Sequence, residues 1–211
     1  MDTIALVESY YLPCLAYFVS IRSSTKILLD NSETYIKQSY RNRCYILGAN
    51  KIQPLSVPVH RGSGKVCTKD VRVAYGNRWQ NNHWRSIASA YGKTPFFAHF
   101  ADEFHDILFH QHKYLIDLNV DLLSKCLELL QWKHTIHFCQ DNDTFIEKKP
   151  INDYREQIQI SETKFKNYQF QPIQYMQAFG KDFAPNLSII DLLFCEGPRA
   201  DYIIQHSLIQ R

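Results

Sequence analysis

The chain has 211 residues, of which 45% are hydrophobic, and a formal net charge of +3 at pH 7. This composition is ordinary for a globular chain with an apolar core. No stretch reaches the roughly 18 uninterrupted apolar residues that a membrane-spanning helix needs. Asp2, Glu8 and Pro13 interrupt the apolar N-terminus, so no signal peptide is predicted. We therefore expect one cytoplasmic domain over residues 1–211.

The first thirty or so residues predict a βαβ unit. Thr3–Glu8 and Lys26–Asp30 contain the apolar runs of buried strands, and Leu15–Ile21 between them is apolar and long enough for two helical turns. A strand, a helix and a strand in this order are typical of a parallel pair with a right-handed crossover.

The middle of the chain predicts a β-meander followed by helices. Turn-like residues separate three strand-like segments, which are Arg43–Leu47, Gln53–Val59 and Asp70–Tyr75. Three segments with helical patterns follow, which are Trp79–Tyr91, Phe97–Phe109 and Leu115–Leu130. The predicted fold is therefore α/β, with a mixed sheet made of the βαβ unit and the meander, flanked by helices.

The last third of the chain is less regular. Thr135–Phe138 predicts a strand, residues 140–166 predict a polar and irregular excursion, and Tyr168–Tyr175 predicts an extended segment. Asn186–Phe194 predicts a helix that is apolar nearly all round, so it should be buried, with Asn186 as its N-cap.

Positive charge is concentrated in residues 37–93, which contain eleven Lys or Arg and one acid, Asp70. Such a segment repels itself unless the acidic remainder of the chain or a bound anion offsets the charge. Both explanations stay open. The second one predicts that the segment lines a pocket for an anionic small molecule.

The densest polar run is 35–43. If this run is extended, its three cations share one face: Lys37, Arg41 and Arg43. The opposite face carries Gln38, Tyr40 and Asn42. Guanidinium and ammonium groups match a phosphate or carboxylate, and the amides suit a sugar or base edge. The alternative is a solvated edge strand.

Two acids interrupt apolar runs, one at the end of a run and one in the middle of another. Asp30 ends a predicted buried strand, at the edge where α/β sheets bind ligands, and is a candidate catalytic base. Asp191 lies within an apolar helix, where a carboxylate needs a partner, so we predict that it pairs with the 35–43 run. His83 is the second candidate base, while Tyr11, Tyr40 and Trp84 would stack on a base or sugar.

The chain has six cysteines and nine histidines, but neither type shows the C-x-x-C or H-x-x-x-H spacing of metal sites. We therefore predict reduced thiols, no bound metal and no cofactor.

Ordered segments along almost the whole chain also carry a family resemblance. They are Tyr11-Leu12-Pro13, Asp30, 35–43, Leu55–Val59, His83–Ile87, Pro95–Phe97, Pro185–Phe194 and Glu196-Gly197-Pro198. In this order they resemble the WbqC-like protein family. Ser9-Tyr10 stands where many members carry Gln-Pro, a variant that resembles the branch common in Bacteroidetes-like bacteria. The resemblance implies a link to bacterial surface polysaccharide (O-antigen) genes and a transferase role, including glycine transfer to a sugar.

Three functions are compatible with these residues. The first is a transferase that acts on an activated anionic substrate such as a nucleotide-linked sugar, with Asp30 or His83 as the base. The second is a non-catalytic module that binds an anionic metabolite. The third, nucleic-acid binding, is the weakest, because the net charge is small and the acidic remainder would repel a long polyanion.

Overall fold

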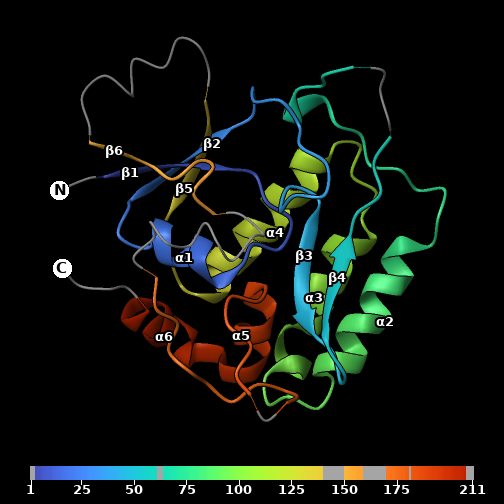
Figure 1. Cartoon of the computed structure of the whole chain (residues 1–211), viewed down its shortest axis with the longest axis vertical. Helices are drawn as coiled ribbons and strands as arrows, with labels where there is room; N and C mark the ends of the chain where they lie inside the picture. Colours follow the sequence, from blue (N-terminus) through green and yellow to red (C-terminus); the bar gives the residue numbers. More distant parts are fainter. Residues whose placement is uncertain (1–2, 61–63, 140–149, 159–169, 181, 208–211) are drawn as a thin grey trace.

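The computed structural model describes residues 3–60, 64–139, 150–158, 170–180 and 182–207. Its main sheet has four parallel strands in the order β5-β2-β1-β6 (Figure 1). The strands are β1 (Ile4–Glu8), β2 (Lys26–Asp30), β5 (Thr135–Phe138) and β6 (Ile151–Asp153). Helix α1 (Leu15–Ile21) connects β1 to the parallel strand β2, so the predicted βαβ unit is confirmed.

The strand register brings acidic residues together at one edge of this sheet. Glu8 lies opposite Asp30, and Leu6 lies opposite Asp153, so three strands end in an acid at neighbouring positions. We call this end of the sheet the carboxyl edge and the opposite end the amino edge. All five residues of β1 are buried, so the strand that carries Glu8 is covered on both sides.

A second, antiparallel sheet consists of β3 (Arg43–Leu47) and β4 (Ile52–Ser56). The predicted third strand over Asp70–Tyr75 is wrong. A 3₁₀ turn, η1 (Thr68–Asp70), is followed only by isolated bridges at Arg72 and Val73. Val71 and Val73 are buried and Arg72 is exposed, so the alternation in the sequence is real, but no hydrogen-bonded ladder accompanies it.

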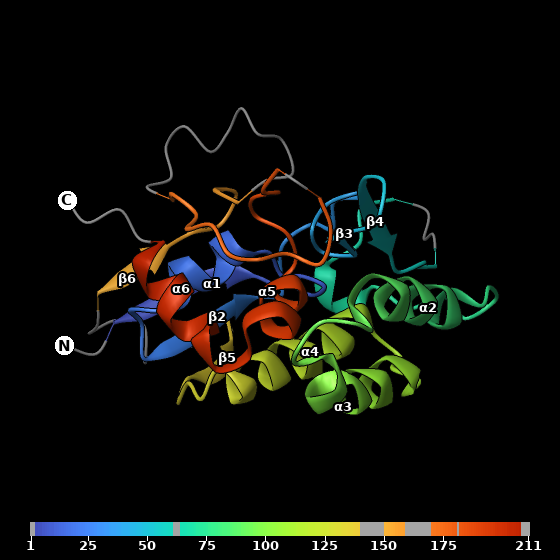
Figure 2. The same cartoon turned by 90° about the horizontal axis from the view of Figure 1, so that it is seen from below.

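Helices α2 (Trp79–Tyr91), α3 (Phe97–Phe109) and α4 (Leu115–Leu129) match the predicted segments to within one residue. The chain ends in α5 (Ile189–Glu196), η3 (Gly197–Arg199) and α6 (Ala200–His206). Figures 1 and 2 show α5 and α6 beside α1, and α2 and α3 with β3 and β4 in the other half of the molecule. The predicted mixed α/β architecture is therefore confirmed.

The segment predicted as an irregular excursion contains a strand. β6 lies within residues 140–166, of which 140–149 and 159–166 are outside the described residues. Its sequence, Ile-Asn-Asp, is too short and too polar to give a strand pattern, and it is held by pairing with β1. Of the predicted extended segment, residues 168–169 are outside the described residues and 171–175 form no strand.

The late helix begins three residues after its predicted start. Asn186 has a φ of 57°, and its side-chain oxygen accepts a hydrogen bond from the amide of Ala16 at 2.8 Å. Asn186 therefore caps α1 rather than its own helix, because the first amides of α1 lack partners within that helix. The late helix is buried, as predicted.

Most of the buried hydrophobic residues of the sheets and helices form one continuous core, and Ile4, Leu6 and Leu28 of β1 and β2 form a smaller, separate cluster. Tyr11, Tyr17 and Phe18 are fully enclosed within the larger core. Among the described residues, no helix has the length and apolar character required to span a membrane.

Candidate functional site

A cavity of about 380 Å³ opens at the carboxyl edge of the parallel sheet, where α/β proteins commonly bind ligands. Its lining comes from the end of β1, the turn between β2 and β3, and the segment after β6. The lining residues are Glu8, Tyr10, Ile36, Lys37, Gln38, Ser39, Tyr40, Arg41, Glu156 and Ile158. We call it the carboxyl-edge cavity.

The polar run 35–43 contributes to this cavity as a turn and not as an extended strand. Residues 37–42 form turns, and Gln38 has a φ of 55°. The predicted alternation of faces is therefore wrong. Lys37, Gln38, Tyr40 and Arg41 line the cavity.

The last two residues of the run point elsewhere. The amide nitrogen of Asn42 donates to the carbonyl of Val57 at 2.9 Å, and Nε of Arg43 donates to Oγ of Ser56 at 2.8 Å. Both side chains therefore join the run to the segment at and after the end of β4, and neither belongs to the cavity lining.

Arg41 is buried and already paired. Its Nε and Nη2 donate to the two carboxylate oxygens of Glu33 at 2.8 and 2.6 Å, and Nη2 also contacts Oε1 of Glu8. Burial alone would lower the pKa of Arg41, but these carboxylates hold it above its ordinary value. Because both acids occupy the guanidinium group, Arg41 has little capacity left for a substrate phosphate.

Glu8 presents a buried carboxylate at the cavity. Its Oε1 contacts Arg41, while Oε2 contacts the phenol of Tyr10 and lies 3.4 Å from the amide of Glu156. The phenol oxygen of Tyr10 also lies 3.0 Å from the carbonyl of Ile158. Burial, followed by the nearby Glu8 charge, raises the pKa of Tyr10 well above its ordinary value, so Tyr10 keeps its proton at neutral pH.

Asp30 lies beside Glu8 in the sheet but does not line the cavity. Its carboxylate accepts from Nη1 of Arg155 at 2.7 Å and from the amide and hydroxyl of Ser32 at 3.1 and 3.0 Å. Burial acts to raise the pKa of Asp30, but the hydrogen bonds from Arg155 and Ser32 outweigh it and lower the pKa. Arg155 also pairs with Asp153, so it joins the ends of β2 and β6 across β1.

The structure places three other predicted site residues outside this cavity. The phenol of Tyr11 lies 2.9 Å from Nδ1 of His83, and both residues are buried. Burial lowers the pKa of His83 to about 4, so its imidazole is neutral at pH 7. Trp84 stacks on Phe97 with a centroid distance of 6.0 Å.

Asp191 is fully buried, as predicted, but the prediction of its partner is wrong. No group of the 35–43 run contacts it. Its oxygens accept from the phenols of Tyr91 and Tyr175 at 2.9 and 2.6 Å and from the amide of Gln177 at 2.9 Å. Burial raises the pKa of Asp191, and these three hydrogen bonds oppose that rise only in part.

Two members of the basic segment, Lys37 and Arg41, line the cavity. Most of the other cations of the segment are exposed on the surface. They are Lys51, Lys65, Lys69, Arg72, Arg78, Arg85 and Lys93. Arg61 is outside the described residues. The charge of the segment is therefore mainly solvated. Within the part of the chain that the structure describes, no three His, Cys, Asp or Glu side chains form a group that could hold a metal ion.

Sequence reasoning missed Glu8 and Tyr10. Glu8 ends the apolar run of β1 as Asp30 ends that of β2, so the same signal was available for both acids. Tyr10 carries no such signal, because its role depends on the position of Ile158, which is distant in the chain.

Comparisons with known proteins identify the family of the chain. A Mycobacterium tuberculosis protein with the name "Uncharacterized protein Rv1507c" is 26% identical over 96% of this chain and 98% of its own length. No solved structure matches. The sequence profile of the WbqC-like protein family matches residues 8–163 and 152–203. The chain therefore belongs to the WbqC-like protein family.

Proposed function

We propose that this chain is a transferase that binds an activated anionic small molecule, such as a nucleotide-linked sugar, in the carboxyl-edge cavity. The observation that carries the proposal is a shared lining: the buried carboxylate of Glu8 and the ammonium of Lys37 belong to one cavity of about 380 Å³. A proton acceptor and an anion-binding group are what transfer from a phosphate-activated donor requires. The volume suits a small molecule.

Lys37 is the cation that would receive the phosphate. It is exposed and, among the described residues, forms no ion pair, whereas Arg41 is occupied by Glu8 and Glu33. Gln38 lies next to it on the same turn and offers an amide to a sugar or base edge. Of the three cations predicted from the sequence, the proposal therefore keeps only Lys37 as an anion-binding group.

Glu8 is the proposed general base. An acceptor hydroxyl or amine passes its proton to Oε2 of Glu8 while its oxygen or nitrogen bonds to the transferred carbon. The bond from that carbon to the donor phosphate breaks, and the phosphate leaves with the electron pair. Once protonated, Glu8 donates to Tyr10, and Tyr10 donates to the carbonyl of Ile158, so every group keeps a partner.

Asp30 and His83, the bases predicted from the sequence, receive supporting roles in this proposal. Asp30 is held by Arg155 and Ser32, which lower its pKa below its ordinary value although burial opposes this, and it lies outside the cavity lining. His83 is neutral and lies outside the cavity lining, where it supports Tyr11.

Family membership supports a place in bacterial surface polysaccharide (O-antigen) biosynthesis, with a glycyl or other acyl group as a candidate for transfer. The buried cysteines Cys14, Cys44, Cys126 and Cys195 are free thiols, which supports a reducing, cytoplasmic compartment.

A non-catalytic module for the same class of anion is the second candidate. The pairing of Glu8 with Arg41 favours it, because a buried ion pair can serve to hold the shape of a binding site without taking part in chemistry. Nucleic-acid binding has less support, because Tyr11 and Trp84 pack against other rings.

Isothermal titration of UDP, GDP and dTDP, followed by a turnover assay with the corresponding nucleotide sugars, tests the proposal. We expect Lys37→Ala to weaken binding roughly 10- to 100-fold, as for loss of a charge-assisted hydrogen bond. Lys51→Ala, which removes an exposed lysine at the β3–β4 turn, should change nothing. Glu8→Gln should bind normally and lose turnover by about 10²- to 10⁴-fold.

Nucleotide binding that is unchanged in Lys37→Ala would contradict the proposed binding site. Normal binding without turnover in the unmodified protein would favour the non-catalytic module.

A further inference from the structure

A second cavity, of about 630 Å³, opens at the amino edge of the parallel sheet, and we call it the amino-edge cavity. Arg22 follows α1, residues 128–134 run from the last turn of α4 to the start of β5, and Asp201 lies in the first turn of α6. It shares no lining residue with the carboxyl-edge cavity. A ligand bound here would therefore not touch Glu8 or Lys37.

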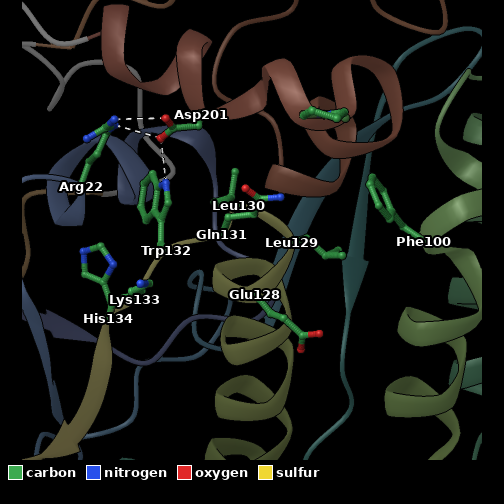
Figure 3. A pocket seen from close by; sticks show the side chains of 12 residues that line it. Arg22, Phe100, Glu128, Leu129, Leu130, Gln131, Trp132, Lys133, His134 and Asp201 are labelled. Carbon is green, nitrogen blue, oxygen red and sulfur yellow. Dashed lines mark hydrogen bonds and ion pairs between the residues drawn. The ribbon is translucent and has the colours of Figure 1, made fainter.

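Aromatic side chains flank the amino-edge cavity. In Figure 3, Trp132 and Phe100 lie on opposite sides of it. The indole of Trp132 is fixed, because its Nε1 donates to Asp201 at 2.7 Å and the guanidinium carbon of Arg22 lies 5.6 Å from its ring. Fixed rings offer flat apolar surface to a ligand at little entropic cost.

The end of α4 adds hydrogen-bond acceptors to the lining. The amides of Gln131 and Trp132 turn back to the carbonyls of Glu128 and Leu127, both at 2.9 Å, which closes the helix as a Schellman turn. The carbonyls of Leu129 and Leu130 receive no hydrogen bond from any described residue. The exposed amide of Gln131 lies beside them.

The charges of the lining leave one cation without an ion pair. Glu128 pairs with Lys125 at 2.7 Å, and Asp201 pairs with Arg22 at 3.1 Å. Lys133 is exposed and has no ion pair within the described part of the chain. Lys125 also pairs with Glu103 at 3.0 Å, so the formal charges of the lining balance, and Lys133 is the described lining cation that is available to an acidic group of a ligand.

We propose that the amino-edge cavity is an accessory saccharide site that favours neutral and acidic sugars over amino sugars. The apolar C–H faces of a sugar ring can pack on Trp132 and Phe100. Its hydroxyls can donate to the carbonyls of Leu129 and Leu130 and accept from Lys133. Small-molecule sites combine such apolar walls with a few placed polar groups. The inference rests on this cavity alone and does not depend on the proposed transferase reaction.

Glucose, glucuronate and glucosamine, titrated separately and followed by saturation-transfer NMR, test the proposal. For such small ligands we expect dissociation constants on the order of millimolar. Glucuronate should bind several-fold more tightly than glucose, because Lys133 pairs with its carboxylate. Glucosamine, which is cationic, should bind more weakly than glucose.

Two variants and one control make the test specific. Lys133→Gln should remove the preference for glucuronate and keep glucose binding. Gln131→Gly should weaken the binding of all three sugars. It should keep the fold intact, because glycine adopts the φ of 58° at this position without strain. Lys51→Ala should have no effect. The proposal is overturned by no sugar signal up to roughly 100 mM, by equal binding of the three sugars, or by a preference that survives Lys133→Gln.

Discussion

Glu8 and Asp191 are both buried carboxylates, with 3% and 0% of their surfaces exposed, but their surroundings differ. Glu8 ends a strand, contacts the cation Arg41 and borders a cavity. Asp191 lies within a helix, accepts only from neutral donors and borders neither of the two cavities. Burial is therefore common to both acids, whereas a cavity and a paired cation are found only beside Glu8. The proposed function assigns the base to Glu8 on the strength of that cavity.

The largest expected effect concerns the cation beside Glu8. Arg41→Met leaves Glu8 and Glu33 close together without a positive charge, so we expect a loss of about 3–5 kcal/mol in the free energy of unfolding. Urea denaturation at pH 7 measures it. Arg43→Met, which loses only the hydrogen bond to Ser56, is the matched control and should cost about 1 kcal/mol. Equal losses in both variants would remove the special status of the Glu8–Arg41 pair.

Asp191→Asn should cost less, about 2 kcal/mol at pH 7, because its partners are neutral and one oxygen still accepts. Burial raises the pKa of Asp191 in the folded chain above the ordinary 3.8. Above pH 3.8 the unfolded chain loses a proton that the folded chain retains, so the unmodified protein loses stability as the pH rises through this window. Asp191→Asn cannot undergo this loss. The difference in the free energy of unfolding between the unmodified protein and Asp191→Asn should therefore narrow as the pH rises. A difference that widens would contradict the raised pKa of Asp191.

Asp30 should show the opposite pH dependence. Although burial opposes it, hydrogen bonding to Arg155 and Ser32 lowers the pKa of Asp30 in the folded chain below the ordinary 3.8. Its contribution is present above pH 3.8 and is lost as the pH falls through the lower folded value. Asp30→Asn should therefore cost about 1 kcal/mol at pH 7, since Arg155 is partly exposed. Thermal melts at several pH values should show this cost disappearing in acid.

The smallest expected changes in stability concern two residues that have the same strained backbone conformation. Gln38 at the carboxyl-edge cavity and Asn186 in the fold have φ values of 55° and 57°. Gln38→Gly should raise stability by about 0.5–1 kcal/mol, because glycine adopts this φ freely and the side chain has no hydrogen bond within the described residues. Asn186→Gly gains the same relief but loses the cap on Ala16, so it should be neutral or destabilising. A gain in both variants would show that the cap contributes nothing.

Much of the fold was predictable from local patterns. The apolar runs and helical spacings of β1, β2 and α2 through α4 are strong, and the structure follows them closely. β6 was missed, because three residues of mixed polarity give no pattern of their own. Asn186 was assigned to the wrong helix, since a cap donated from a distant segment looks the same in sequence as a local one.

The site was predictable only in part. The 35–43 run was predicted to face a ligand, and six of its residues line a cavity. Its turn at Gln38 could not be deduced, because a positive φ at glutamine is uncommon. The partners of Asp191 come from α2 and from residues 175–177, and no sequence spacing connects these segments. Long-range pairing of polar groups is what the sequence leaves open.

The most direct test of the central claim is a crystal structure of the protein with a bound nucleotide sugar. The proposed function predicts electron density in the carboxyl-edge cavity, with the phosphates near Lys37 and the transferred group near Glu8 and Tyr10. Density on the exposed cations Arg72, Arg78 or Arg85, with the carboxyl-edge cavity empty, would contradict it.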